Sequence, residues 1–199
     1  MSTAATRIPL PQAVAEAERF RALFDGTYDR WEFAGSIRRK KPDIGDIEHV
    51  VIPRRDERES GDLYGSMELF NTLRARAEDL ISTRRLALHN YSMVDDVERH
   101  RFGERYFGVD YGGRLHEVYM CEPDNWGMIM AIRTGSADFC QLLMRRLRAN
   151  GYQSIGGRLF INGLIGQLEL RAAPHEDTVL HAAGLKYEDW PPEKREVEP

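Results

Sequence analysis

The chain has 199 residues, 42% of them hydrophobic, and its 28 basic and 32 acidic residues give a formal net charge of −4. This hydrophobic content is sufficient for one ordinary core, or for a domain with a smaller lobe attached. The negative charge weighs against tight, sequence-independent binding of duplex nucleic acid, although it leaves room for a local basic groove.

The cysteine content and the hydropathy of the chain indicate the kind of cellular compartment in which we expect it. The two cysteines, Cys121 and Cys140, provide neither a disulfide framework nor a zinc ligand set, which suits a reducing compartment. The N-terminus lacks an apolar signal core, and no apolar run reaches membrane-spanning length. We therefore expect a monomer that is cytoplasmic or nucleoid-associated, is not secreted and does not bind membranes.

The first third of the chain predicts one helix and two strands. Residues 11–24 form an amphipathic pattern with a proline near its start, which indicates a helix. Residues 30–35 predict a short strand that ends in a Gly-Ser turn. Residues 46–53 predict a second strand, which Pro53 ends.

The middle of the chain predicts a loop, a helix and a hairpin. Residues 54–66 are polar and charged, which is typical of a loop. Residues 67–81 have the apolar spacing of a second amphipathic helix. Residues 104–122 alternate around Gly112-Gly113, which predicts a β-hairpin.

The character of the sequence changes near Glu122, where we place a domain boundary. The sequence that follows predicts two helices separated by Thr-Gly-Ser, then a hairpin, a short capped helix and an extended tail, at residues 124–133, 137–150, 157–172, 175–184 and 185–199. The expected fold is α/β: residues 1–122 form a mixed sheet with helices on one face, and residues 123–199 form a small α+β lobe.

Acidic residues at the start of the 46–53 strand suggest a metal site. Asp46 and Glu48 alternate along the predicted strand, so both point to one face and repel each other unless a cation lies between them. Hard cations such as Mg²⁺ prefer oxygen ligands. Glu117, in the predicted hairpin, would be a third ligand if its strand lies alongside, and three acids can hold the two metals of an in-line phosphoryl transfer. Ordinary strand-edge charges are an equally good explanation of Asp46 and Glu48 alone.

The stretch before these acids suggests phosphate binding. The Gly35-Ser36 turn exposes backbone N–H groups, and the Ser36 hydroxyl adds a donor. Arg38 and Arg39 can pair with phosphate through two hydrogen bonds each. The alternative is a solvated basic loop. The order of glycine, serine, arginines and acids favours a site that binds a triphosphate together with its Mg²⁺.

Three blocks carry a resemblance to a known family. They are GSIRRKKPDIGDIEHVVI (residues 35–52), HEVYMCEPDNWGMIMAIRTGS (116–136) and EDTVLHAAGLKYEDWPPEKRE (176–196). Together, and in this order, they resemble the family X DNA polymerases of the nucleotidyltransferase superfamily. The resemblance implies a nucleotidyltransferase palm at 1–122 and a thumb-like lobe at 123–199, a reduced form of the family.

The resemblance also implies roles for individual residues. Asp46, Glu48 and Glu117 match the three acids that bind two Mg²⁺ ions, for which Mn²⁺ can substitute. The triphosphate contacts match Gly35, Ser36, Arg39 and Gly45. The break that lies against the sugar and base matches Thr134 and Gly135, with Arg133 beside them.

The chain departs from the family pattern at several positions. Its second and third acids are Glu where Asp is usual, and Ile132-Arg133 stands where the family has an aromatic pair. The segment 54–103 matches poorly, and HRFGER (100–105) is either a substrate-gripping insertion or a loop. His49 and His116 face away from the acids, where packing is the better explanation.

These observations lead to one functional hypothesis and two alternatives. The first is a small DNA polymerase that transfers nucleotides from a nucleoside triphosphate to the 3′-hydroxyl of a DNA primer or DNA end. The second is a nucleotidyltransferase that modifies RNA, protein or a small acceptor. The third is a catalytically weak nucleic-acid-binding module.

Overall fold

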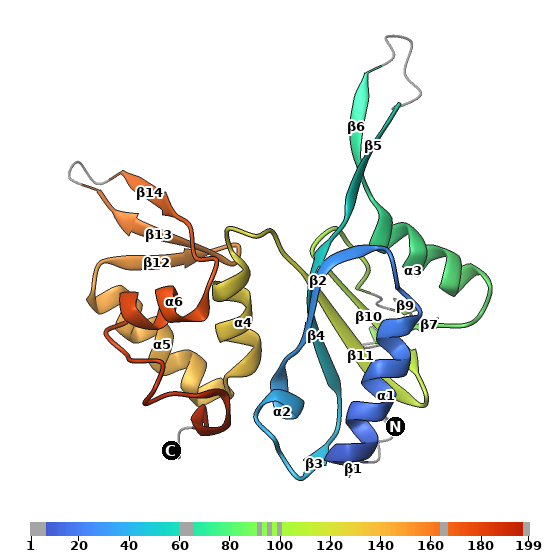
Figure 1. Cartoon of the computed structure of the whole chain (residues 1–199), viewed down its shortest axis with the longest axis horizontal. Helices are drawn as coiled ribbons and strands as arrows, with labels where there is room; N and C mark the ends of the chain where they lie inside the picture. Colours follow the sequence, from blue (N-terminus) through green and yellow to red (C-terminus); the bar gives the residue numbers. More distant parts are fainter. Residues whose placement is uncertain are drawn as a thin grey trace.

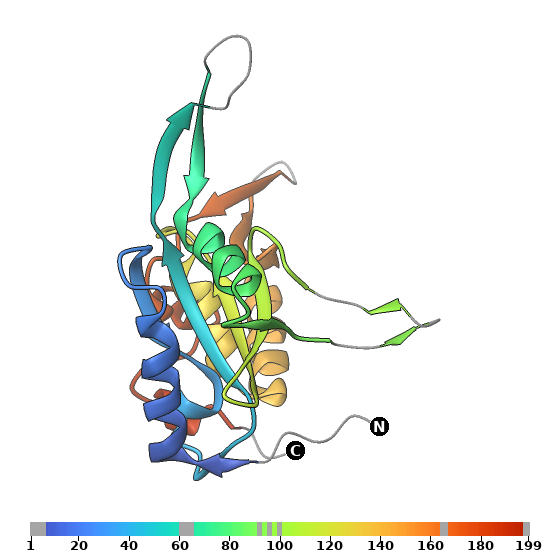
Figure 2. The same ribbon diagram turned by 90° about the vertical axis from the view of Figure 1, so that its right-hand side faces the viewer.

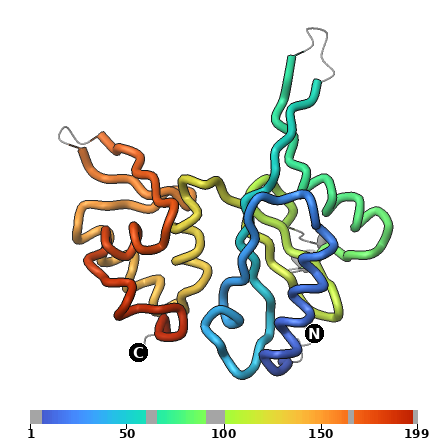
Figure 3. The backbone as a smooth tube through the Cα atoms, viewed as in Figure 1, coloured from blue at the N-terminus to red at the C-terminus, as the bar shows by residue number. Residues whose placement is uncertain are grey.

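The computed structural model describes residues 7–59, 66–90, 93–94, 97–98, 101–163 and 167–196. The described chain forms two lobes, which the backbone connects through the link between β11 and α4 (Figures 1 and 3). In the described part of the chain, no helix combines the length and the apolar character needed to cross a bilayer.

The first lobe is built on a five-stranded sheet in the order β2-β4-β11-β10-β7. Its strands are β2 (Tyr28–Phe33), β4 (Ile47–Pro53), β11 (Arg114–Met120), β10 (Tyr106–Tyr111) and β7 (Ala87–Leu88). Strand β4 pairs with β11 in parallel, whereas the other pairs are antiparallel. The prediction of an α/β fold with a mixed sheet is therefore confirmed.

Two helices, α1 (Leu10–Ala22) and α3 (Thr72–Ser82), cover one face of this sheet. The core between them consists of buried apolar side chains, among them Phe20, Phe24, Trp31, Val51, Leu73, Leu80, Phe107 and Val118. The opposite face carries alternate residues of the same strands, because side chains alternate along a strand. Helix α4 (Trp126–Thr134) of the second lobe packs on part of that face, where Met130 contacts the cluster of Val50 and Ile52.

The prediction for residues 54–81 is wrong in two places. Residues expected in a loop form β5 (Arg55–Glu59), which pairs with β6 (Met67–Asn71) in a hairpin that projects from the lobe (Figures 1 and 2). The predicted helix starts only at Thr72, because the Asn71 side chain caps it by accepting a hydrogen bond from the Arg74 amide at 3.0 Å. The predicted loop residues 60–65 lie outside the described residues.

The short elements of the first lobe lie around this framework. The Gly-Ser turn is the start of a one-turn helix, α2 (Gly35–Arg38), while β1 (Ile8–Pro9) pairs with β3 (Asp43–Ile44). Strand β8 (Met93–Val94) pairs with β9 (Val97–Glu98) on an arm that extends sideways (Figure 2).

The second lobe combines helices with a three-stranded sheet. Helix α5 (Ala137–Ala149) and helix α6 (Glu176–Ala182) pack with α4 around a core that includes Phe139, Leu143, Leu147, Leu159 and Val179. The sheet is antiparallel and contains β12 (Tyr152–Ile155), β13 (Arg158–Asn162) and β14 (Leu168–Arg171). The sequence predicted the second hairpin but not β12.

The C-terminal segment is not the extended tail that its prolines suggested. It folds back on the lobe, forms a short 3₁₀ helix at Pro192–Lys194, and buries the Arg195 side chain completely. This packing brings the tail next to α2 of the first lobe, where Lys40 pairs with Glu193 at 2.5 Å.

Candidate active site

The parallel pairing of β4 and β11 brings two of the three predicted acids together. Glu48 and Glu117 stand opposite each other in the register of these strands, on the face of the sheet that α1 does not cover. Asp46 lies in the bend immediately before β4 and is exposed, so it is outside the strand in which the sequence placed it. Asp46 and Glu117 nevertheless both lie close enough to Glu48 for their charges to act on it.

The Glu48 carboxylate lies against the backbone of Gly35, at the start of α2. A Cβ atom built on Gly35 would stand 1.8 Å from Glu48 Oε2, and Gly35 has a φ of +53°, a conformation that glycine adopts most easily. The Ala34 amide also donates to the Glu48 carbonyl at 2.9 Å. The backbone conformation therefore favours glycine at position 35, and a Cβ atom there would displace the Glu48 carboxylate.

The electrostatics of Glu48 reflect the two neighbouring acids. Burial first, and then the nearby charges of Asp46 and Glu117, raise the pKa of Glu48 to about 8, against the opposing effect of Arg133 and Arg39. A cluster of this kind binds a proton or a cation in preference to holding all its negative charge unpaired.

Glu117 is held by a tyrosine that the sequence did not point to. The Tyr106 hydroxyl donates to Glu117 Oε1 at 2.6 Å. Burial of the neighbouring Tyr119, together with the charge of Glu117, raises the pKa of the Tyr119 hydroxyl above its usual range. Within the described residues, no three carboxylate, imidazole or thiolate groups are close enough to share one metal ion as they stand. The donor set of three neighbouring carboxylates suits Mg²⁺ in its chemistry, and sharing an ion requires the carboxylates to come closer together than they stand here.

The arginines of α2 contact the second lobe. Arg38 donates two hydrogen bonds to Glu176, at 2.8 and 2.5 Å, and a third to the Thr134 hydroxyl at 2.7 Å. Arg39 donates to the Thr134 carbonyl at 2.6 Å and to Glu196 at 3.2 Å. These residues therefore join the two lobes in this conformation, and for Arg38 this is a different role from the phosphate pairing that the sequence suggested.

The remaining predicted residues lie around the same junction. Ser36 Oγ accepts from Arg39 at 3.3 Å, and the Gly45 carbonyl accepts from Arg114 at 3.1 Å. The Arg133 guanidinium lies 3.7 Å from the Tyr119 ring centroid. A Cβ on Gly135 would lie 2.3 Å from the Phe139 ring, so this glycine lets α4 and α5 meet closely.

Glu176 is the residue that sequence reasoning missed at this junction. It binds Arg38 on one side and the buried Arg195 on the other. Burial acts to raise the pKa of Glu176, but the hydrogen bonds and charges of Arg38 and Arg195 outweigh it and hold the pKa below its usual range. The two consecutive acids at 176–177 were the only sequence signal for this residue, and no local pattern indicates that Arg38 and Arg195 are the partners of Glu176.

The two histidines that face away from the acids are buried, as the sequence predicted. The Trp31 indole donates to His49 at 3.1 Å, and His49 and His116 share a hydrogen bond of 3.0 Å. His116 also lies 3.3 Å from Glu16 on α1, so these groups satisfy one another beneath the sheet.

Comparison with known proteins adds no family to this picture. No protein-family model matches the sequence, and no curated protein matches it either.

Proposed function

We propose that this chain is a Mg²⁺-dependent nucleotidyltransferase, a reduced relative of the family X DNA polymerases with a palm and a thumb-like C-terminal lobe. The observation that carries the proposal is the pairing of Glu48 and Glu117 across parallel strands, with the Gly35 backbone against Glu48. The Gly-Ser turn, the two arginines, Asp46 and Glu48 come from the first sequence block, and Glu117 comes from the second. The effect of Asp46 and Glu117 on the charge of Glu48 supports their assignment to one site.

Each group has a defined task in the proposed reaction. Asp46, Glu48 and Glu117 would hold the two Mg²⁺ ions, which supply Lewis-acid activation of the phosphate and of the attacking oxygen. Ser36, Arg39 and the backbone at Gly35 and Gly45 would bind the triphosphate, in exchange for the contacts that Arg39 makes with Glu196 and Thr134.

The transfer itself balances without any other reactant. The acceptor hydroxyl oxygen forms a bond to the α-phosphorus, the bond from that phosphorus to the bridging oxygen breaks, and pyrophosphate leaves. The hydroxyl proton passes to water. The site contributes mainly by positioning and by neutralising charge, because this reaction asks little covalent chemistry of the protein.

The decisive test is transfer from a labelled nucleoside triphosphate in Mg²⁺ or Mn²⁺. The acceptors are gapped DNA, single-stranded DNA, RNA and a protein mixture, so that the assay separates a DNA polymerase from the alternative transferases. We expect activity in the wild type and its loss, by at least about a hundredfold, in Glu48→Gln and Glu117→Gln. Transfer that is equally fast in these variants, or none on any acceptor, would reject the proposal.

A further inference from the structure

A pocket between the two lobes lies beside Glu117. Its volume of about 420 Å³ is within the range of about 300–1,000 Å³ that is typical of small-molecule sites. We call it the Arg101 pocket; its main lining residues are Arg101, Arg105, Tyr106, Tyr119, Ile132 and Arg133.

One of these lining residues connects the pocket to the acids. The Tyr106 hydroxyl donates to the Glu117 carboxylate at 2.6 Å. A molecule in the pocket therefore lies one side chain away from the third acid, one of the ligands proposed for the metals that would activate the attacking oxygen.

The charge of the pocket is opposite to that of the whole chain. Three arginines line it, and no acidic residue is among its described lining residues, although the formal net charge of the protein is −4. Arg101 and Arg105 come from the HRFGER segment, which lies outside the three blocks that resemble the polymerases. A planar guanidinium pairs well with phosphate, so two of them near one wall favour an anionic, phosphate-bearing ligand.

Other residues of the pocket lining are suited to a flat, partly apolar group. The guanidinium of Arg133 lies on the Tyr119 ring at 3.7 Å, and Ile129 and Ile132 provide an apolar wall beside it. A nucleobase stacks favourably on such a surface. Phosphate-binding and base-binding surfaces in one pocket together describe a nucleotide.

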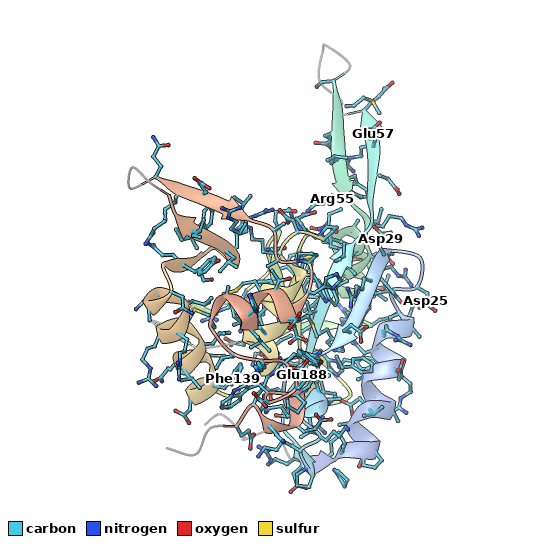
Figure 4. The ribbon with its side chains drawn as sticks, turned by 60° about the vertical axis from the view of Figure 1, so that its left-hand side comes forward. Asp25, Asp29, Arg55, Glu57, Phe139 and Glu188 are labelled. Carbon is cyan, nitrogen blue, oxygen red and sulfur yellow. The ribbon has the colours of Figure 1, made fainter. Side chains whose placement is uncertain are left out.

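The size of the pocket and one contact across it favour a single nucleotide unit as the ligand. Arg105 Nη1 contacts the Gly156 carbonyl of the β12–β13 turn at 3.5 Å, which connects the first lobe to the second. In the adjacent pocket, Arg55, labelled in Figure 4 at the base of the β5–β6 hairpin, pairs with Glu122 at 2.5 Å. A volume of about 420 Å³ suits one nucleotide, whereas a continuous duplex would require the contact between Arg105 and Gly156 to separate.

We infer that the Arg101 pocket binds the acceptor as a single nucleotide unit, with its phosphate on Arg101 and Arg105 and a free hydroxyl towards Glu117. The nucleotide is either free or the last unit of a single strand, since both have the same phosphate, sugar and base. The role as acceptor rests on the proposed function, whereas the binding does not.

The test measures binding to the full chain by calorimetry, without a nucleoside triphosphate. The probes are AMP, adenosine and a short single-stranded DNA with a free 3′-end. The variants are the double change Arg101→Gln/Arg105→Gln, the single change Arg105→Gln, and the control Arg19→Gln. Arg19 is an exposed arginine of α1, on the other side of the sheet, and it is not among the residues that line the pocket.

We expect AMP or the single strand to bind, and adenosine to bind about tenfold more weakly than AMP, because it lacks the phosphate that the arginines would hold. The double change should weaken binding of the phosphate-bearing probe by about tenfold or more, and the control should leave it unchanged. AMP binding identifies a free nucleotide as the source, and binding of the single strand alone identifies a strand end.

Equal binding of AMP and adenosine, unchanged binding in the double variant, or no binding of any probe would overturn the inference. If the double variant does not fold, Arg105→Gln carries the test, since this side chain is exposed. Arginine-dependent binding without transfer to any acceptor would reject the proposed function and leave the pocket assignment standing.

Discussion

Gly35 is the residue on which the geometry of the acids depends most directly. Its φ of +53° would strain any other residue, and a Cβ atom there would displace the Glu48 carboxylate. Gly26 has an equally unusual φ of +83°, but a Cβ there would meet no atom within 4 Å. Comparing alanine substitutions at these two glycines therefore separates the free-energy cost of the backbone conformation from the cost of displacing Glu48.

We expect Gly35→Ala to destabilise the protein and to abolish transfer, because Glu48 must move. Gly26→Ala should cost only the backbone strain, about 1–2 kcal/mol, and should retain activity. Denaturant unfolding and the transfer assay measure the two effects. Equal stability loss and equal activity in both variants would contradict the close approach seen at Gly35.

Glu48 gives a second prediction at this scale, in the pH dependence of stability. Because the folded protein holds the pKa of Glu48 at about 8, against 4.5 for an ordinary exposed glutamate, the folded state binds more protons than the unfolded state between these pH values. The stabilisation that comes from this proton is complete below about pH 4.5 and is lost as the pH rises through about 8.

We therefore expect metal-free Glu48→Gln to gain stability relative to the wild type as the pH rises from 5 to 9. Urea unfolding in the presence of a chelator measures the difference. Added Mg²⁺ should remove it at pH 8 by stabilising the wild type alone. Parallel pH profiles for the two proteins would show that Glu48 is not in the predicted environment.

Among the elements, the C-terminal segment contributes a buried ion pair, between Arg195 and Glu176, that no pattern in the sequence predicted. Arg195 is fully buried, and it pairs with Glu176 of α6, which Arg38 of α2 binds from the other side. One atom of Arg195, Nη2, is buried without a partner, so this arginine depends strongly on its pair with Glu176.

Glu176→Gln should therefore destabilise the protein by about 3–5 kcal/mol, because it leaves two arginines without their shared carboxylate. Glu193→Gln is the matched control. Glu193 lies on the same C-terminal segment as Arg195 and pairs with the exposed Lys40, so its substitution should change the free energy of unfolding little. Chemical denaturation compares the two variants. A small effect of Glu176→Gln would mean that the buried pair contributes little to the fold.

At the scale of the whole molecule, the two lobes meet through residues that the proposed reaction also needs. Arg39 contacts the Thr134 carbonyl and Glu196, although its proposed partner is the triphosphate. Glu196 also pairs with Lys41. Nucleotide binding and the contact between the lobes therefore compete for the same guanidinium.

Two changes should have opposite effects on this competition. Arg39→Ala should raise the apparent KM for the nucleoside triphosphate by about tenfold or more, because it removes a charge-assisted contact. Glu196→Gln should lower that KM severalfold, because it removes the competing carboxylate. Steady-state kinetics with varied triphosphate distinguishes them. Glu193→Gln, which removes the salt-bridge partner of Lys40 and not a partner of Arg39, is the control. A KM that rises in Glu196→Gln would exclude the competition.

The sequence by itself determined the local features of this protein. Alternation around Gly112-Gly113 predicted the β10–β11 hairpin, and the Thr-Gly-Ser break placed the boundary between α4 and α5, because these signals involve neighbouring residues. The sequence also places Gly35, Asp46 and Glu48 within one short stretch, and this grouping predicted that they belong to one site.

Only the tertiary structure decided which distant residues meet. The parallel register that sets Glu48 opposite Glu117 depends on packing across 69 positions of the chain, and no local pattern encodes it. The strand at Met67–Asn71 was mistaken for helix because its pairing with Arg55–Glu59 overrides its own apolar spacing. Glu176 likewise pairs with Arg195 only once the C-terminal segment folds back, and with Arg38 only once the two lobes meet. These pairs form because a buried charge needs a partner, and the residues are not neighbours in the sequence.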